Sequence, residues 1–304
     1  MPSYAFRLVN VFAESTFGGN PLCVFEDARG MDDALMLNLA VQFNLSETTF
    51  IFPSEQADAH VRIYTPGYEM RFAGHPTLGT AHVVRDLGMA GDALTLEVKA
   101  GVVPVVAQGD RWTFTAPSRG APAVTPPSAP AGDIAALMGL SADDLLDEPM
   151  WVDTGIDQLL IPVKSLEAVR RARPDSSRLD AWPRSSLGRR TAYVFAFGDT
   201  ADDGRQAVLA RYFFAKDAGG VVEDPATGSA CANLGGWLLA GRRPMPARIA
   251  VSQGEQAGRP CTLYLDVEAE GVIRVGGRVV ALGRGEIVLP DATAARSAMQ
   301  GTGR

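Results

Sequence analysis

The feature of the sequence that most constrains the fold is a seven-residue pattern that occurs twice. Residues 75–81 read HPTLGTA and residues 224–230 read DPATGSA, so both fit the frame [HD]-P-x-x-G-[ST]-A without a gap. An arginine precedes each copy at the same offset, because Arg62 and Arg211 are 149 residues apart, as the two motifs are. This repeat favours duplication of a structural unit. The alternative is a chance match of five positions in seven.

Strand-like and helix-like segments surround both copies. Short runs rich in valine, isoleucine, threonine and aromatic residues end at glycine, proline or aspartate, which is typical of β-strands. Helical spacing of apolar residues, or the end signals of a helix, occur at residues 31–44, 75–88 and 228–241. We therefore expect an α+β fold of two pseudo-symmetric lobes, each a curved, mostly antiparallel sheet wrapped around a central helix.

A change of composition marks the expected boundary between the lobes. Residues 116–133 are rich in proline, alanine, glycine and serine, which predicts a linker or a long surface loop. The first lobe is expected over residues 1–118 and the second over 119–283, with the last strand, at about 284–304, returning to the first. The tail after Pro290 is small and polar, and we expect it to be poorly ordered or a loose helix.

Charge and hydropathy exclude several classes of partner. The net charge is −7, the pI is near 5.1 and no basic stripe is present, so neither nucleic acid nor an anionic membrane is an expected partner. No apolar run approaches the roughly 20 residues of a membrane span, and the first residues lack a signal-peptide pattern. We expect a cytoplasmic protein whose partner is a small molecule.

Few residues are available for metal or cofactor chemistry. The three histidines and three cysteines are scattered and show no metal-ligand spacing, and scattered cysteines suit a reducing compartment. None of the three lysines, Lys99, Lys164 and Lys216, lies in a distinctive motif that would hold pyridoxal phosphate. We expect no metal and no cofactor.

Each repeated motif opens a helix with small residues, which suggests an anion site. The first N–H groups of a helix have no internal partners and carry partial positive charge. Gly79 with Thr80, and Gly228 with Ser229, are expected to let an anionic group approach that backbone. Two helix starts facing each other across a cleft would hold one small carboxylate. The alternative is that both motifs only cap helices.

Three residues carry the expected chemistry. His75 and Asp224 are the differing members of the repeat and would offer unlike groups at mirrored places. Glu47 lies in the polar stretch of NLSETTFIF, where apolar surroundings would raise its carboxyl pKa toward the range of a general acid/base. The alternatives are a turn histidine and a capping glutamate. Cys23 and Cys231 lie in apolar runs and are expected to pack rather than react.

The motifs together resemble the PhzF-like phenazine-biosynthesis family, which has the diaminopimelate epimerase fold. The matching stretches occur in the family's order from about Phe6 to Leu289: GNPLCVF, LSETTF, FAGHPTLGTA, EDPATGSA and QG…GRP. The resemblance implies a homodimeric isomerase, free of cofactor and metal, that works by proton transfer. In the best-understood relatives the substrate is trans-2,3-dihydro-3-hydroxyanthranilate.

The resemblance also assigns roles to individual residues. Glu47 matches the catalytic glutamate, which removes a proton from a ring carbon and returns it elsewhere on the conjugated system. His75 and Asp224 match groups that hold and polarise the substrate. The expected substrate-binding residues are Ser46, Gly74, Gly228 and Ser229.

Departures from related enzymes narrow the mechanism without fixing the substrate. Racemases and epimerases of this fold use two thiols at the helix starts, where this chain has no cysteine, so that mechanism is excluded. Cys261 stands where many relatives have a small hydroxyl residue, and residues 121–187 carry none of the family's motifs. An epimerase, a hydro-lyase and a non-catalytic protein that binds small acids stay open as alternatives.

Overall fold

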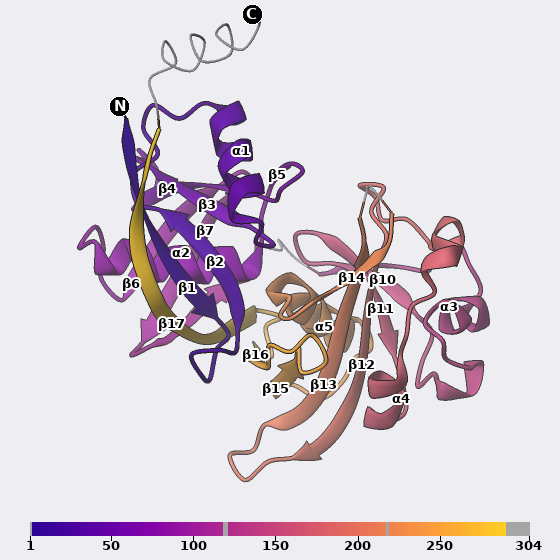
Figure 1. Cartoon of the computed structure of the whole chain (residues 1–304). Helices are drawn as coiled ribbons and strands as arrows, with labels where there is room; N and C mark the ends of the chain where they lie inside the picture. The colour runs from indigo at the N-terminus through magenta and orange to yellow at the C-terminus, as the bar shows by residue number, and fades with distance from the viewer. Residues whose placement is uncertain (1, 118–120, 217–218, 290–304) are drawn as a thin grey trace, which may run out of the picture.

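The computed structural model of the chain (Figure 1) describes residues 2–117, 121–216 and 219–289. The tail expected after Pro290 lies outside these residues. Among the described residues, no helix is long and apolar enough to cross a membrane.

Eight strands surround helix α2 (Gly74–Asp86) in a closed ring. In order of pairing around the ring, they are β1 (Ser3–Val11), β2 (Asn20–Phe25), β3 (Thr48–Phe52), β4 (Ala59–Tyr64), β6 (Ala93–Val98), β7 (Gly101–Gln108), β8 (Arg111–Thr115) and β17 (Ile273–Val288), which pairs again with β1. The β2–β3 and β4–β6 pairs are parallel and the other pairs are antiparallel. This part of the sheet is therefore a closed, barrel-like arrangement with a helix in its interior.

The remaining strands continue the same mixed sheet beside helix α5 (Gly228–Ala240). They pair in the order β9 (Ala123–Thr125), β10 (Met150–Asp153), β11 (Asp157–Pro162), β12 (Thr191–Thr200), β13 (Gln206–Ala215), β15 (Ala247–Gln253), β16 (Cys261–Val267) and then β17. The parallel pairs are β11–β12 and β13–β15. Strand β17 pairs with β16 at its start and with β1 further on, so it belongs to both groups of strands (Figure 1).

Two short strands repeat the same local arrangement. β5 (Glu69–Met70) pairs with β4 and comes before α2, and β14 (Val221–Asp224) pairs with β13 and comes before α5. Each hairpin carries an ion pair from one of the repeated arginines: Arg62 to Glu69 at 2.7 Å and Arg211 to Glu223 at 2.6 Å. The upstream arginine of the repeat therefore has the same structural role in both copies.

The buried apolar residues that the structure describes form three clusters that match this arrangement of strands and helices. α2 and α5 are nearly all buried and belong to one large apolar cluster that includes Leu78, Trp112, Leu234 and Trp237. Helix α1 (Asp33–Phe43) packs against the outer face of the first strands through Met36 and its neighbours. Helices α3 (Ala131–Leu137) and α4 (Leu166–Arg171) cover the other group in a separate cluster.

The predicted helices at 31–44, 75–88 and 228–241 are confirmed as α1, α2 and α5. The prediction of a linker or loop over residues 116–133 is wrong in part, because β9 and the start of α3 lie inside it. Neither element has a strong local signal: β9 is three residues long and α3 is seven. Elements this short form because they pair or pack with distant parts of the chain, here β10 and Trp151 of the outer cluster.

Candidate active site

The starts of α2 and α5 touch each other. A Cβ placed on Gly74 would lie 2.9 Å from the Cα of Gly228, and one on Gly228 would lie 3.1 Å from the Cα of Gly74. Only glycine permits this approach. Neither helix has a side-chain cap at its N-cap residue, Ala73 or Thr227. Two uncapped helix starts therefore meet, and their free N–H groups form a region of partial positive charge suited to an anion.

The structure corrects the ungapped alignment of the repeat. His75 is the second residue of α2, whereas Asp224 is the last residue of β14 and precedes the first residue of α5 by a short turn. The prediction that the two occupy mirrored places is therefore wrong. The reason lies with the prolines. Pro76 lies in the first turn of α2, where a missing N–H costs nothing, while Pro225 lies in the turn before α5.

Gly79 and Thr80 do not lie where an anion could approach the backbone. A Cβ on Gly79 would lie 2.6 Å from Leu22 Cδ2, inside the core, and the Thr80 hydroxyl is buried 2.8 Å from that of Thr49. The expectation that this pair admits an anion is wrong. Gly79 serves close packing of α2 against the strands, and the glycine at the start of this helix is Gly74, the residue before the motif.

Glu47 and His75 face each other in a buried space. Glu47 follows α1 at the entry to β3, and its Oε2 lies 3.4 Å from His75 Nε2. Both atoms are buried and have no hydrogen-bond partner among the described residues, and the Glu47 side chain is 15% exposed. Burial, followed by the charge of Asp224, raises the Glu47 pKa well above its ordinary range. A carboxyl group that holds a proton near neutral pH is suited to general acid/base catalysis.

His75 is held as a neutral ring. Burial lowers its pKa to about 3, and the ring hydrogen-bonds to the backbone of Pro21. Since proline has no N–H, the bond runs from the ring to the Pro21 carbonyl. With Nε2 facing Glu47, the donor is Nδ1, and Nε2 is left as an acceptor. A protonated Glu47 can therefore share its proton with His75.

Asp224 lies in a network of polar groups. Its carboxylate accepts hydrogen bonds from Asn20 Nδ2 at 2.9 Å and from Thr227 Oγ1 at 2.5 Å. Gln253 Nε2 donates to the Asp224 carbonyl at 2.9 Å. Burial raises the pKa of Asp224, and the hydrogen bonds from Thr227 and Asn20 to its carboxylate oppose that rise. The network fixes the Asp224 carboxylate in a position where its charge raises the pKa of Glu47.

Sequence reasoning missed Asn20, Gln253 and Arg259 as parts of the site. Asn20 bonds to Asp224 and also to the Ala226 carbonyl at 2.9 Å, and so joins β2 to the turn before α5. Arg259 Nε donates to the Gly19 carbonyl at 2.7 Å and holds the turn that carries Asn20. The only signal was their presence inside the quoted stretches GNPLCVF and QG…GRP, which named segments rather than roles.

The remaining predicted residues have different surroundings. Ser229 Oγ accepts a hydrogen bond from Gln158 Nε2 at 2.8 Å, whereas Ser46 is exposed beside Glu47.

The buried thiols of Cys23 and Cys231 have strongly raised pKa values, and that of Cys261 is raised to about 12, in each case mainly by burial. These thiols are therefore poor nucleophiles. The described residues contain no group of three or more histidine, cysteine or acidic side chains arranged for a metal ion.

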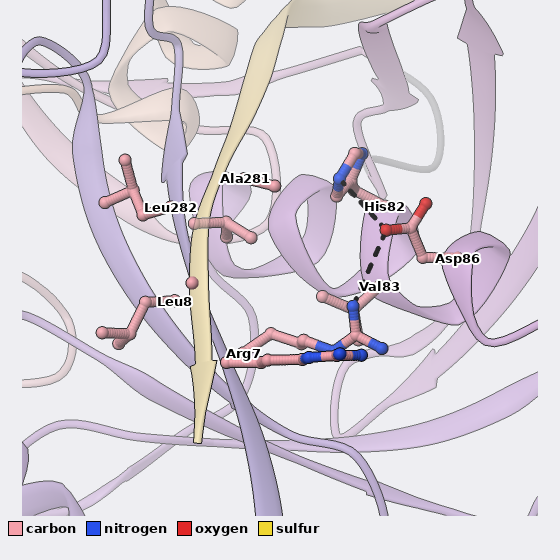
Figure 2. Close-up of a pocket in the computed structure, with 10 residues that line it drawn as sticks. Arg7, Leu8, His82, Val83, Asp86, Ala281 and Leu282 are labelled. Atoms are coloured by element: carbon pink, nitrogen blue, oxygen red, sulfur yellow. Dashed lines mark ion pairs between the residues drawn. The ribbon is translucent and has the colours of Figure 1, made fainter.

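A separate hollow of about 330 Å³ lies on another side of α2 (Figure 2). It sits where Leu282 interrupts the register of β1 with β17. His82 and Arg7 line it, each 3.9 Å from Asp86. The residues that line this hollow include none of the predicted site residues. Burial lowers the pKa of His82, so this histidine is neutral and packs edge-on against Trp112.

The raised pKa of Glu47 leads to a prediction that needs no substrate. A carboxyl group whose pKa is raised by folding stabilises the fold below its unfolded pKa, near 4.5, and this contribution is lost as pH rises through the folded value. We expect Glu47→Gln to become progressively more stable than the wild type as pH rises from 4.5 to beyond neutrality. Urea unfolding across this pH range measures the difference. The exposed Glu55→Gln is the control, and a pH-independent difference for Glu47→Gln would contradict the prediction.

Comparison with known proteins is consistent with this geometry. The chain matches the family described as phenazine biosynthesis-like protein over residues 9–285. It is 38% identical to an uncharacterized isomerase of Pasteurella multocida, covering 95% of each chain. It is 31% identical to trans-2,3-dihydro-3-hydroxyanthranilate isomerase of Pseudomonas aeruginosa, covering 94% of this chain and all of the relative.

The fold is shared with a solved structure. The crystal structure of the Bacillus anthracis phenazine biosynthesis protein, PhzF family, superimposes with a TM-score of 0.80 at 23% identity, covering 95% of this chain and all of that one. The expected resemblance is confirmed. The chain belongs to the phenazine biosynthesis-like protein family and is an isomerase.

Proposed function

We propose that this isomerase moves a proton between two carbons of a small conjugated or cyclic acid, using Glu47 as the acid/base. The observation that carries the proposal is the buried contact between Glu47 Oε2 and His75 Nε2, beside the starts of two helices. Neither atom has a hydrogen-bond partner in the part of the chain that the structure describes. A paired acid and base with unused hydrogen-bonding capacity is what a proton transfer requires.

The proposed reaction conserves every atom of the substrate. In its ionised form, Glu47 removes a proton from a substrate carbon, and the electrons of the broken C–H bond move into the conjugated system. The same carboxyl group then delivers the proton to another carbon of that system, which regenerates the carboxylate. While Glu47 carries the proton, its O–H can donate to Nε2 of neutral His75, whose tautomer is held by Pro21.

The substrate carboxylate is assigned to the helix starts at Gly74 and Gly228. Their uncapped N–H groups supply hydrogen bonds and partial positive charge. Asp224, held by Asn20 and Thr227, is placed to accept a hydrogen bond from an amino or hydroxyl group of the substrate. Ser229 and Ser46 complete the proposed binding residues. A substrate like trans-2,3-dihydro-3-hydroxyanthranilate, on which the Pseudomonas aeruginosa relative is named as acting, has all these groups.

The isomerase names of the relatives favour this reaction over an epimerase, a hydro-lyase or a non-catalytic binding protein. Proton transfer by Glu47 and His75 needs no metal and no cofactor, and we expect the enzyme to work without either. We expect small-molecule substrates in the cytoplasm and no binding to nucleic acid or membrane.

The finer architecture is also part of the proposal. The order of pairing from β1 to β8 recurs from β10 to β17, with α2 and α5 at corresponding places. This recurrence supports two pseudo-symmetric lobes of diaminopimelate epimerase type. The proposed bounds are 1–118 and 119–283, with about 284–304 returning to the first lobe. We also expect a homodimer, and a monomer mass in light scattering would refute it.

His75→Ala and Asp224→Asn are expected to impair both substrate binding and turnover, because both groups position the substrate as well as polarise it. The experiment first screens small conjugated acids in heavy water by NMR for deuterium uptake, and then measures kcat and KM with the acid that exchanges. EDTA is expected to leave the wild-type rate unchanged. Variants that change kcat alone, with KM intact, would contradict a positioning role.

A further inference from the structure

Arg189 is a cation beside the candidate site that the proposed mechanism does not use. It ends a tight turn before β12, in which Ser185 N donates to the Arg189 carbonyl at 2.8 Å and Arg189 N donates to Ser185 Oγ at 3.2 Å. The turn is tied down further by Asp157, which accepts hydrogen bonds from the backbone and hydroxyl of Ser186. The backbone that carries Arg189 is therefore held in place.

The Arg189 side chain reaches across to the other group of strands. Its Cζ lies 4.7 Å from the centre of the Tyr68 ring, which belongs to the turn between β4 and β5. The hairpin of β4 and β5 leads directly into α2 and its start at Gly74. Stacking of a guanidinium on an aromatic ring leaves its N–H groups free at the edge to bind a planar anion.

Within the described residues, no carboxylate forms an ion pair with Arg189, although the next residue, Arg190, pairs with Asp180 at 3.2 Å. The positive charge of Arg189 instead lowers the pKa of Glu47 and the pKa of Tyr212, although burial raises both values more strongly. Tyr212 lies opposite Asp224 in the β13–β14 pairing. The turn that carries Arg189 also adjoins the start of α5. Asp157, which holds Ser186 of this turn, is followed by Gln158, which donates to Ser229 Oγ at 2.8 Å. Arg189 therefore lies next to the site and has no ion-pair partner among the described carboxylates.

We propose that Arg189 binds a second anionic group of the substrate, apart from the carboxylate at the helix starts. The enzyme would then act on small acids with two anionic substituents, one more than trans-2,3-dihydro-3-hydroxyanthranilate carries. This inference rests on the proposed function for the location of the first carboxylate. The planar fork of Arg189 suits a carboxylate, which it can bind through two parallel hydrogen bonds. Tyr68 would hold the guanidinium in the orientation that receives it.

Benzoate and the three benzenedicarboxylates test the proposal by titration calorimetry, because the isomers place a second carboxylate at three different separations. The wild type is expected to bind at least one diacid about tenfold or more tighter than benzoate. Arg189→Gln is expected to abolish this preference while binding benzoate as the wild type does. Arg189→Lys should keep part of the preference, and Arg190→Gln, the matched control, should keep all of it.

Two results would overturn the proposal: a wild type with no preference for any diacid, or an Arg189→Gln variant that retains the preference. Thermal unfolding shows whether each variant is folded. The calorimetric result does not depend on catalysis. Failure of Glu47→Gln to lose activity would therefore overturn the proposed reaction and leave the role of Arg189 to be decided by binding alone.

Discussion

Replacement of Glu47 by glutamine is expected to lower turnover by about 10²–10⁴-fold, the usual contribution of a positioned acid/base. Glutamine has nearly the same size and can still hydrogen-bond to His75, but it cannot accept the substrate proton. Substrate binding is expected to stay within a few-fold of the wild type, because the carboxylate grip at Gly74 and Gly228 is not altered. Measurement of kcat and KM separates the two effects.

Heavy water gives the most direct readout of this change. The wild type is expected to place deuterium on a substrate carbon, and Glu47→Gln is expected not to. Glu55→Gln, an exposed change of the same chemistry, serves as the control and should exchange normally. Near-wild-type exchange in Glu47→Gln would show that another group is the base, and the site assignment built on SETTF would have to be abandoned.

The parts of the fold that could be predicted are those with strong local signals. Both α2 and α5 begin with small residues, and each has apolar residues at helical spacing or the end signals of a helix. Clear strand patterns lie nearby, so the sequence predicts helices at residues 75–88 and 228–241. Helices α3 and α4 gave no such signals. These short elements depend on packing in the outer cluster around Trp151 and Trp182, which a linear pattern does not reveal.

Part of the site was predictable for a similar reason, and part was not. Glu47 stands out as a polar residue between apolar runs, and the structure places it 3.4 Å from His75, as a shared site requires. The alignment of His75 with Asp224 failed because sequence similarity does not show where a helix begins. Asn20 and Arg189 were missed because their roles come from contacts with residues far away in the chain.

Gly228→Val is expected to weaken the binding of every small acid, monoacid or diacid, by at least about tenfold. A Cβ at this position would lie 3.1 Å from Gly74 Cα and 3.2 Å from Phe12 Cζ, closer than ordinary contacts. The branched valine side chain would push the two helix starts apart, and their N–H groups could no longer converge on one carboxylate. Titration calorimetry with benzoate and with sulfate measures the loss.

Two further variants make this result interpretable. Gly228→Ala adds only the Cβ, whose neighbours need to move by a few tenths of an ångström, so it should cost less affinity than valine. Gly91→Val is the matched control, because a Cβ at exposed Gly91 meets no atom of the described residues within 4 Å. Thermal unfolding must show that Gly228→Val is folded, since the valine also presses on core residue Phe12. If the folded variant binds benzoate and sulfate as the wild type does, the helix starts do not hold the carboxylate, and the contact between Gly74 and Gly228 serves packing alone.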